Sequence, residues 1–437
     1  MRHTHNFLSK AELLLVEELF VFPPITFRQV AEQERNHPMS TSGLPLSNDS
    51  SNEERHVGSF HVGYSQLHPD VSLNYQMNRF STGEADMIGE MRAVVPRIHD
   101  YSDYTREFLA LSEQALAHGE TLKGAYYLRS AEFYMFSTNP RKQPARRRFL
   151  HLMREHFGVK ASEQYAIPYQ ASTLSAYRFT PLQPKGTILL FGGFDSYIEE
   201  LFATQCFLRD AGFDVISFDG PGQGASLEEA HLPLTHEWEK PVKAVLDYFH
   251  LDDVTLMGYS LGGCLAVRAA AYESRVQRLI TDDILTDFFE VTMRQVSAAV
   301  RAELSLLLKI GAAGVVNTLL ERAMKQSLVV EWGLQQGMHV TGTKTPYEFL
   351  KQSQLYRTDD VSPLVEQDVL LLAGAEDHYV PLHQFYDQIR SLSQVRSLTA
   401  RLFTRQEQAQ NHVQVGNIGL SLRVITNWIE SIQSKNQ

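Results

Sequence analysis

The chain has little cysteine: its 437 residues include only Cys206 and Cys264. The two lie far apart in the sequence, and each falls within a predicted helix. Disulfide frameworks are typical of small secreted domains, whereas isolated thiols stay reduced inside the cell. We therefore predict two reduced, buried thiols and a cytoplasmic location.

Long apolar segments are also missing. The short run at residues 13–16 is followed at once by Glu17 and Glu18, so it lacks the apolar core of a signal peptide. The best other candidate for a membrane span, residues 304–320, contains Lys309 and two glycines. Because a bilayer span requires about 20 predominantly apolar residues, we expect neither a signal peptide nor a membrane partner.

Positive charge is in deficit. With 40 Lys and Arg against 51 Asp and Glu, the net charge is −11, which argues mildly against a nucleic-acid partner. The exception is a basic run formed by Arg141, Lys142, Arg146, Arg147 and Arg148. Such a run is usually a solvated helix start or linker, and we interpret it so.

Metal and cofactor motifs are absent as well. A zinc-protease H-E-x-x-H motif is broken after His236, and no Cys/His cluster suggests zinc. The glycine pattern at residues 219–226 lacks the third glycine of a dinucleotide fingerprint and the Lys-Ser/Thr of a phosphate loop. We interpret it as a structural turn and expect no metal and no cofactor.

What the chain does contain is Gly-Tyr-Ser-Leu-Gly at residues 258–262. An apolar segment that predicts a buried strand precedes it, and a predicted helix follows from residue 264. A serine at such a strand-to-helix turn is the nucleophile elbow of the α/β-hydrolases, where small neighbours let strand and helix pass closely. This motif predicts Ser260 as a nucleophile.

The remaining sequence predicts an α/β protein with two regions. Residues 1–157 are expected to be a helical cap or lid domain, with a helix start at residues 9–12 and a loop at residues 36–58. Residues 158–437 alternate predicted strands and helices, as in a mostly parallel, doubly wound sheet. Residues 284–357 break this alternation, and we expect them to be a helical insertion that joins the cap.

An acid and a base follow Ser260 in the chain order that this fold requires. Asp377 comes just after a predicted strand and before a proline, with Glu376 as its local rival. His412 follows the last predicted strand and precedes the last helix. His378 and His383 are alternatives, but His378 shares the loop of the acid and His383 lies within a predicted helix. The expected triad is Ser260, Asp377 and His412.

An oxyanion hole needs two backbone N–H groups that point at the developing negative charge. One is expected from Leu261, the residue after the nucleophile. The other should come from the loop after the predicted strand at residues 186–191, from Phe194 or, alternatively, Gly193.

These segments, from residues 192–200, 219–226, 258–263 and 374–381 to Asn411-His412, together resemble a cap-bearing α/β-hydrolase family. The family includes 2,6-dihydroxypseudooxynicotine hydrolase, the fungal heptaketide-shortening hydrolases and esterase-like relatives. The resemblance implies the same triad and a helical lid over the pocket. Several members hydrolyse a carbon–carbon bond beside a ketone.

We therefore expect a serine hydrolase that acts through an acyl-enzyme on a small to medium, apolar, polyketide-like carbonyl substrate. The bond could be an ester, a thioester or a carbon–carbon bond beside a ketone. A catalytically silent binding protein and a peptidase or amidase of the same fold are the alternatives, and a homodimer is open. Four further carboxylates could face the pocket but are expected to be helix caps or solvated groups, without an assigned role: Asp195, Asp282, Asp283 and Asp287.

Overall fold

The computed structural model describes residues 60–294 and 296–435. The predicted helix start at residues 9–12 and the loop at residues 36–58 lie outside this part of the chain. None of the helices in the described part is long and apolar enough to cross a membrane. Cys206 and Cys264 are both buried and neither is in a disulfide, as predicted.

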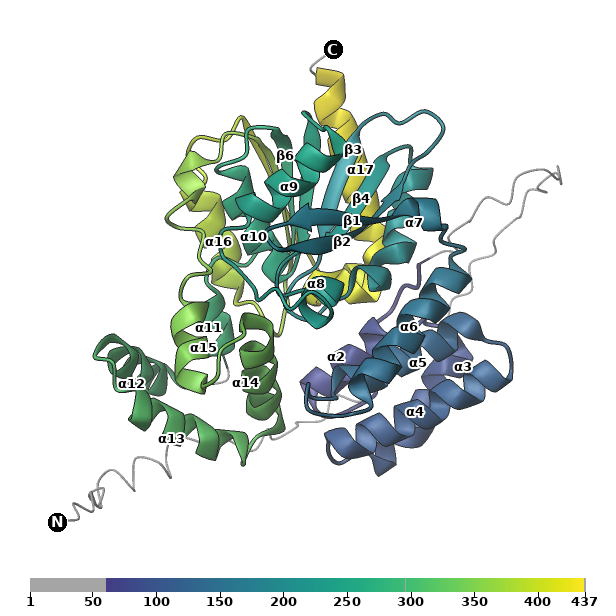
Figure 1. Cartoon of the computed structure of the whole chain (residues 1–437), viewed down its shortest axis with the longest axis vertical. Coiled ribbons are helices and arrows are strands. Elements are labelled where there is room, and N and C mark those ends of the chain that lie inside the picture. The colour runs from purple at the N-terminus through teal and green to yellow at the C-terminus, as the bar shows by residue number, and fades with distance from the viewer. Residues whose placement is uncertain (1–59, 295, 436–437) are drawn as a thin grey trace. The chain divides into compact units, whose positions relative to one another are not determined.

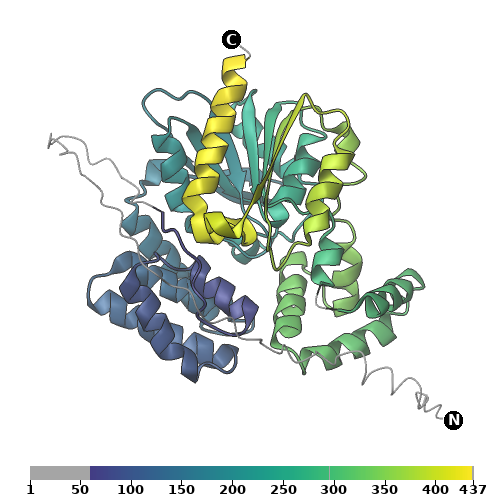
Figure 2. The ribbon, with the colours of Figure 1, turned by 180° about the vertical axis from the view of Figure 1, so that it is seen from behind.

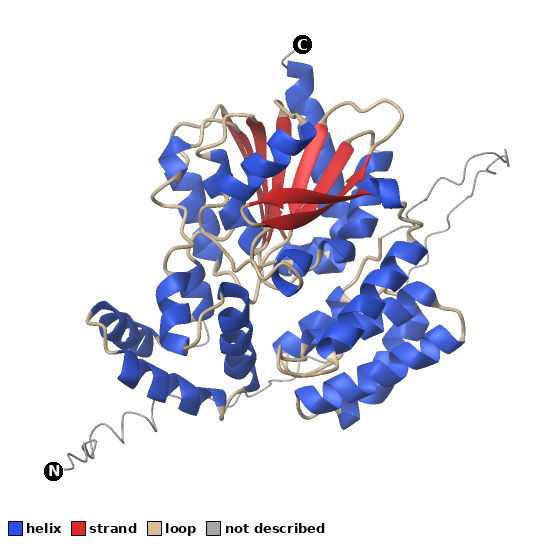
Figure 3. Cartoon of the chain, viewed as in Figure 1, coloured by secondary structure: helices blue, strands red, loops and turns tan. Residues whose placement is uncertain are grey.

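A single eight-stranded sheet forms the centre of the described chain (Figure 3). Its spatial order is β1-β2-β4-β3-β5-β6-β7-β8. The strands from β3 onward pair in parallel, whereas β2 pairs antiparallel with both β1 and β4. The strand bounds are β1 (Gln164–Tyr169), β2 (Ser172–Phe179), β3 (Thr187–Phe191), β4 (Asp214–Asp219), β5 (Val254–Tyr259), β6 (Val276–Asp282), β7 (Asp368–Gly374) and β8 (Ser397–Phe403).

The central strands are buried on both faces because helices cover the sheet from two sides. All residues of β4, β5 and β7 are buried, as expected for parallel strands between helical layers. Helices α9 and α10 lie on one face and α17 on the other (Figures 1 and 2). The helices that connect or flank the strands are α7 (Phe202–Asp210), α8 (Gly224–Glu228), α9 (Glu239–Phe249), α10 (Leu261–Ala270), α16 (Leu382–Ser391) and α17 (Ile418–Lys435).

A group of helices precedes the sheet in the chain and has an apolar core of its own. Met77, Phe80, Met87, Phe108 and Phe149 are among its fully buried members. The helices are α2 (Val71–Arg79), α3 (Ala85–Val94), α4 (Tyr101–Ala117), α5 (Thr121–Phe133) and α6 (Lys142–His156). Helices α3 and α4 each turn one apolar stripe toward this core, as their amphipathic spacing predicts, whereas α5 is buried on nearly all sides.

A second group of helices is inserted between β6 and β7 (Figure 1). It comprises α11 (Phe288–Thr292), α12 (Ala298–Lys309), α13 (Ala313–Met324), α14 (Leu328–Thr341) and α15 (Pro346–Ser353). Trp332 of α14 stacks on Phe133 of α5, with ring centroids 4.9 Å apart, and so joins the two helical groups. The division into a cap at residues 1–157 and a catalytic domain at residues 158–437 stays a prediction.

The basic run at the start of α6 is not solvated throughout, contrary to expectation. Lys142 and Arg146 are 5% and 1% exposed. Lys142 donates to Glu132 at 2.6 Å, and Arg146 donates to Glu229 at 2.8 Å. The physical reason is that the carboxylates come from α5 and from the segment after α8, which no local sequence pattern reveals.

Candidate active site

Ser260 lies at the sharp turn between β5 and α10. Its φ of 57° and ψ of −123° are a conformation that L-residues rarely adopt, at a cost of roughly 1–3 kcal/mol. A Cβ on Gly258 would come within 2.0 Å of the Gly262 carbonyl oxygen, so only glycine fits there. The tight turn leaves the Ser260 side chain partly exposed at the end of the sheet.

The structure brings the three predicted triad residues into hydrogen-bond contact. His412 Nε2 lies 2.8 Å from Ser260 Oγ, and His412 Nδ1 lies 2.5 Å from Asp377 Oδ2. Asp377 follows β7 and His412 follows β8, so both meet Ser260 at the carboxyl edge of the parallel strands. The backbone N–H groups of Tyr379 and Val380 donate to Asp377 Oδ1 and fix the carboxylate.

The three alternative residues lie elsewhere. Glu376 is exposed and accepts a hydrogen bond from Arg405 at 3.0 Å. His383 lies beside Glu290 at 2.9 Å. His378 packs against Tyr379, with tilted rings whose centroids are 3.8 Å apart, and burial lowers the pKa of its imidazole to about 3. None of the three contacts Ser260 among the described residues.

The pair formed by Asp377 and His412 is strongly polarised. Burial raises the pKa of the Asp377 carboxyl. The charge of His412 and its hydrogen bond have the larger, opposite effect, so the pKa lies well below its usual range. Burial likewise lowers the pKa of His412, and the Asp377 carboxylate more than compensates and raises it above the usual value. The buried carboxylate therefore stabilises positive charge on the imidazole.

The loop after β3 lies directly against the nucleophile. A Cβ on Gly193 would be only 2.9 Å from Ser260 Cβ, which shows how closely the backbone approaches. The Gly193 N–H donates to Ser196 Oγ at 3.1 Å. In contrast, the Phe194 N–H has no acceptor among the described residues, so it is the free donor of the two.

Comparison with known proteins identifies the fold in which a serine at such a strand-to-helix turn is found. Residues 190–405 match the family described as the α/β-hydrolase fold. The chain belongs to this family.

Relatives of this α/β hydrolase carry hydrolase names. It is 29% identical to hydrolyase poxO of Penicillium oxalicum over 62% of the chain and 72% of the relative. It is 28% identical to 20-hydroxy-prefusarin hydrolase FUS2 of Gibberella moniliformis over 61% of the chain and 72% of the relative. The crystal structure of 2,6-dihydroxy-pseudo-oxynicotine hydrolase superposes with a TM-score of 0.54 at 21% identity, covering 80% of this chain and 93% of that one. The last similarity supports the fold alone.

Of the four further carboxylates, Asp287 is the expected helix cap, since it accepts from the Glu290 N–H at the start of α11. Asp195 pairs with Arg79 at 2.9 Å. Asp282 and Asp283, expected to be caps or solvated groups, are each 1% exposed. The expectation was wrong for them because the end of β6 is enclosed between β5 and β7.

Asp283 lies beside the predicted triad, although the sequence assigned it no role. Its Oδ2 lies 3.4 Å from His412 Nδ1, so two carboxylates face one imidazole nitrogen. The only sequence signal was the paired aspartates at a strand's carboxyl end, which is weak because acidic residues are common at such positions.

Asp283, Asp377 and His412 also offer three metal-ligand atoms within 4.8 Å of one another. A metal ion bonds such ligands at about 2.0–2.2 Å, which would set the imidazole nitrogen and the carboxylate oxygen roughly 3 Å or more apart. The observed separation for His412 and Asp377 is 2.5 Å. That distance is the distance of a hydrogen bond between the two side chains.

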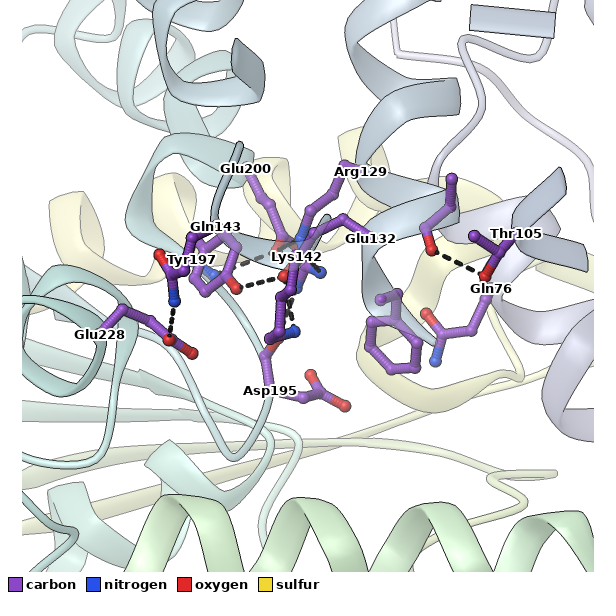
Figure 4. A network of polar contacts seen from close by, with 12 residues as sticks. Gln76, Thr105, Arg129, Glu132, Lys142, Gln143, Asp195, Tyr197, Glu200 and Glu228 are labelled. Atoms are coloured by element: carbon purple, nitrogen blue, oxygen red, sulfur yellow. Dashed lines mark hydrogen bonds and ion pairs between the residues drawn. The ribbon is translucent and has the colours of Figure 1, made fainter. Parts of the chain in front are cut away.

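A buried ionic network holds the loop that carries Phe194 (Figure 4). Arg79 of α2 donates to Asp195 and to Glu200, at 2.9 and 2.8 Å. Arg129 of α5 donates to the Asp195 carbonyl oxygen at 2.6 Å and to Glu200 at 2.7 Å. The N-terminal helices therefore hold the second half of the loop beside Ser260, from Asp195 to Glu200.

Glu132 balances the positive charge of this network. It is fully buried and accepts from Arg129, Lys142 and Tyr197 at 2.5, 2.6 and 2.9 Å. The cavity beside these groups has about 20 Å³, room for roughly one water molecule. The charges are therefore neutralised by one another and not by solvent.

Aromatic rings surround the site from four helices. Phe194 contacts Phe288, Trp332 and Phe349, with ring centroids 5.2 to 6.5 Å apart. Near the histidine, the rings of Tyr75 and Tyr379 lie 6.0 and 5.2 Å from His412. Aromatic side chains therefore pack around both Phe194 and His412.

Replacement of Glu132 by Gln should lower the free energy of unfolding by about 3–5 kcal/mol, because Arg129 and Lys142 would lose their buried counter-charge. Urea unfolding at pH 7 measures this change. The matched control is Glu113→Gln, which removes the exposed ion pair with Arg148 and should cost less than about 1 kcal/mol. Equally small decreases in the free energy of unfolding in both variants would show that the buried network contributes no more to stability than an exposed ion pair.

Proposed function

We propose that this α/β hydrolase is a serine hydrolase that forms an acyl-enzyme on Ser260. His412 acts as the general base, and Asp377 orients it. The observation that carries the proposal is the hydrogen-bond chain from Ser260 Oγ through His412 to Asp377. A serine hydroxyl is a weak nucleophile at neutral pH and needs a base within about 2.6–3.2 Å. His412 is such a base, since its Nε2 lies 2.8 Å from Ser260 Oγ.

In the first half of the reaction, His412 Nε2 takes the proton of the Ser260 hydroxyl as the oxygen attacks the substrate's carbonyl carbon. The N–H groups of Leu261 and Phe194 stabilise the negative oxygen that develops, each at a value of roughly 3 kcal/mol. His412 then gives its proton to the leaving group. In the second half, His412 activates a water molecule, which hydrolyses the acyl-enzyme and regenerates Ser260.

We propose a small to medium, apolar carbonyl substrate of polyketide-like character. The aromatic surroundings of Ser260 support an apolar ligand. The names of the relatives, among them 20-hydroxy-prefusarin hydrolase, support hydrolysis of a natural product. The bond is an ester, a thioester or a carbon–carbon bond beside a ketone; in the last case the proton from His412 goes to the carbon that leaves. The cytoplasmic location and a homodimer stay predictions.

Replacement of Ser260 by Ala should lower kcat about 10⁴- to 10⁶-fold without unfolding the protein, because it removes the nucleophile and leaves the fold intact. Steady-state kinetics and circular dichroism measure the two effects. A fluorophosphonate probe should label the wild type and not the variant. Near-normal turnover in the variant would refute the assignment, and failure to label the wild type would favour a silent binding protein.

The acidic limb of kcat/KM should lie above pH 6.5, the usual pKa of histidine. Only neutral His412 can accept the serine proton, and Asp377 raises the pKa of this imidazole. Activity should therefore be lost as the pH falls through that raised pKa. In Asp377→Asn the limb should move to lower pH, since the carboxylate that stabilises the imidazolium is gone; an unmoved limb would contradict this coupling.

The bond that is cleaved can be identified with two substrate series. If the enzyme is an esterase, p-nitrophenyl esters should be hydrolysed at a much higher kcat/KM than acyl-phenol ketones of equal chain length. If it cleaves carbon–carbon bonds, the ketones should be the better substrates. Hydrolysis of neither series, together with cleavage of amides, would indicate the peptidase or amidase alternative.

A further inference from the structure

We propose that Asp283 is a positioning residue for His412, able to accept the Nδ1 proton when Asp377 cannot. This inference rests on the proposed function, in which His412 is the base. The two carboxylates reach the imidazole from different strands, since Asp283 follows β6 and Asp377 follows β7.

The first observation is the distance. Asp283 Oδ2 lies 3.4 Å from His412 Nδ1, against 2.5 Å for Asp377 Oδ2. All three side chains are nine-tenths or more buried. A small rotation of the imidazole that moves Nδ1 by less than about 1 Å would therefore transfer its hydrogen bond from Asp377 to Asp283, without any change in the backbone.

The second observation is that Asp283 holds the turn directly after the histidine. Its Oδ2 accepts from the Val413 N–H at 2.9 Å, and its Oδ1 accepts from Gln414 Nε2 at 2.6 Å. Val413 and Gln414 have φ values of 53° and 45°. A β-branched residue such as Val413 is strongly disfavoured in this left-handed region, so the turn needs an external anchor. The Asp283 carboxylate is that anchor.

The charges around His412 are consistent with two competing acceptors. With two carboxylates at one imidazolium, burial raises the pKa of Asp283 to about 6, while Asp377 stays the stronger acid. Removing the charge of Asp377 would leave Asp283 as the counter-charge. The titratable side chains that lie around the imidazole are Asp283, Asp377, His378, Tyr75 and Tyr379.

Asp282 provides a matched control. It is as buried as Asp283, and its carboxylate oxygens have no hydrogen-bond partner within the described ranges. Burial and the neighbouring Asp283 raise the pKa of its carboxyl well above the usual value. Asp282→Asn therefore makes the same chemical change at the neighbouring residue, without removing the hydrogen bonds that hold the turn at Val413 and Gln414.

The experiment compares Asp377→Asn, Asp283→Asn, the double variant and Asp282→Asn in the full chain, with a p-nitrophenyl ester as substrate. Loss of the acid alone lowers kcat about 10⁴-fold in triads that have no substitute. Here Asp377→Asn should lose only about 10²-fold, and the double variant should fall the full 10⁴-fold. Asp283→Asn should lower kcat up to about tenfold at unchanged KM and move the acidic limb to lower pH, whereas Asp282→Asn should keep the wild-type profile.

A second measurement does not depend on the folding of Asp283→Asn. The far-downfield proton resonance of the imidazole Nδ1–H should persist in Asp377→Asn, because Asp283 accepts that proton. Its absence there, or equal kcat for Asp377→Asn and the double variant, would overturn the inference. Ser260→Ala and His412→Ala distinguish the two levels: full activity in these variants defeats the proposed function, whereas their inactivity with no effect of Asp283 defeats only the role of Asp283.

Discussion

The hydrogen bond between His412 and Asp377 is formed where water scarcely reaches it, and the geometry of the site depends on it. The two side chains are 5% and 4% exposed. In such surroundings a charged hydrogen bond is stronger than in water, and an unpaired partner would be costly. The bond fixes which ring nitrogen faces Ser260. It exists because parallel strands end at one edge of the sheet. The loops that carry Asp377 and His412 therefore meet Ser260 there, although they follow it by 117 and 152 residues in the sequence.

The N-terminal helices contact both the loop that carries Phe194 and the segment that carries His412. Arg79 and Arg129 hold the loop that carries Phe194, and the Tyr75 hydroxyl donates to the His412 carbonyl oxygen at 3.3 Å. The loop and the histidine are therefore positioned by one group of helices and not by the sheet alone. A helical region that only covered a pocket would need no such buried arginines, because burying a guanidinium is costly unless its partners are equally well placed.

The sequence was sufficient for the fold and for the residues that now meet at Ser260, because these obey a fixed order along the chain. Asp377 and His412 could be selected from many acids and histidines since the topology specifies where each must stand. Asp283 could not be selected in this way. Its place beside His412 depends on β6 lying between β5 and β7 and on the unusual turn at Val413. Lys142 and Arg146 were misjudged for a related reason: a run of basic residues says nothing of the carboxylates that other segments bring to it.

The most direct test of the central claim is to trap the acyl-enzyme. A slowly deacylating p-nitrophenyl ester is mixed with the enzyme, quenched in acid and examined by intact-protein and peptide mass spectrometry. The account predicts one added acyl group, carried by the peptide that contains Ser260. Turnover with no added mass, or an acyl group on another residue, would contradict it.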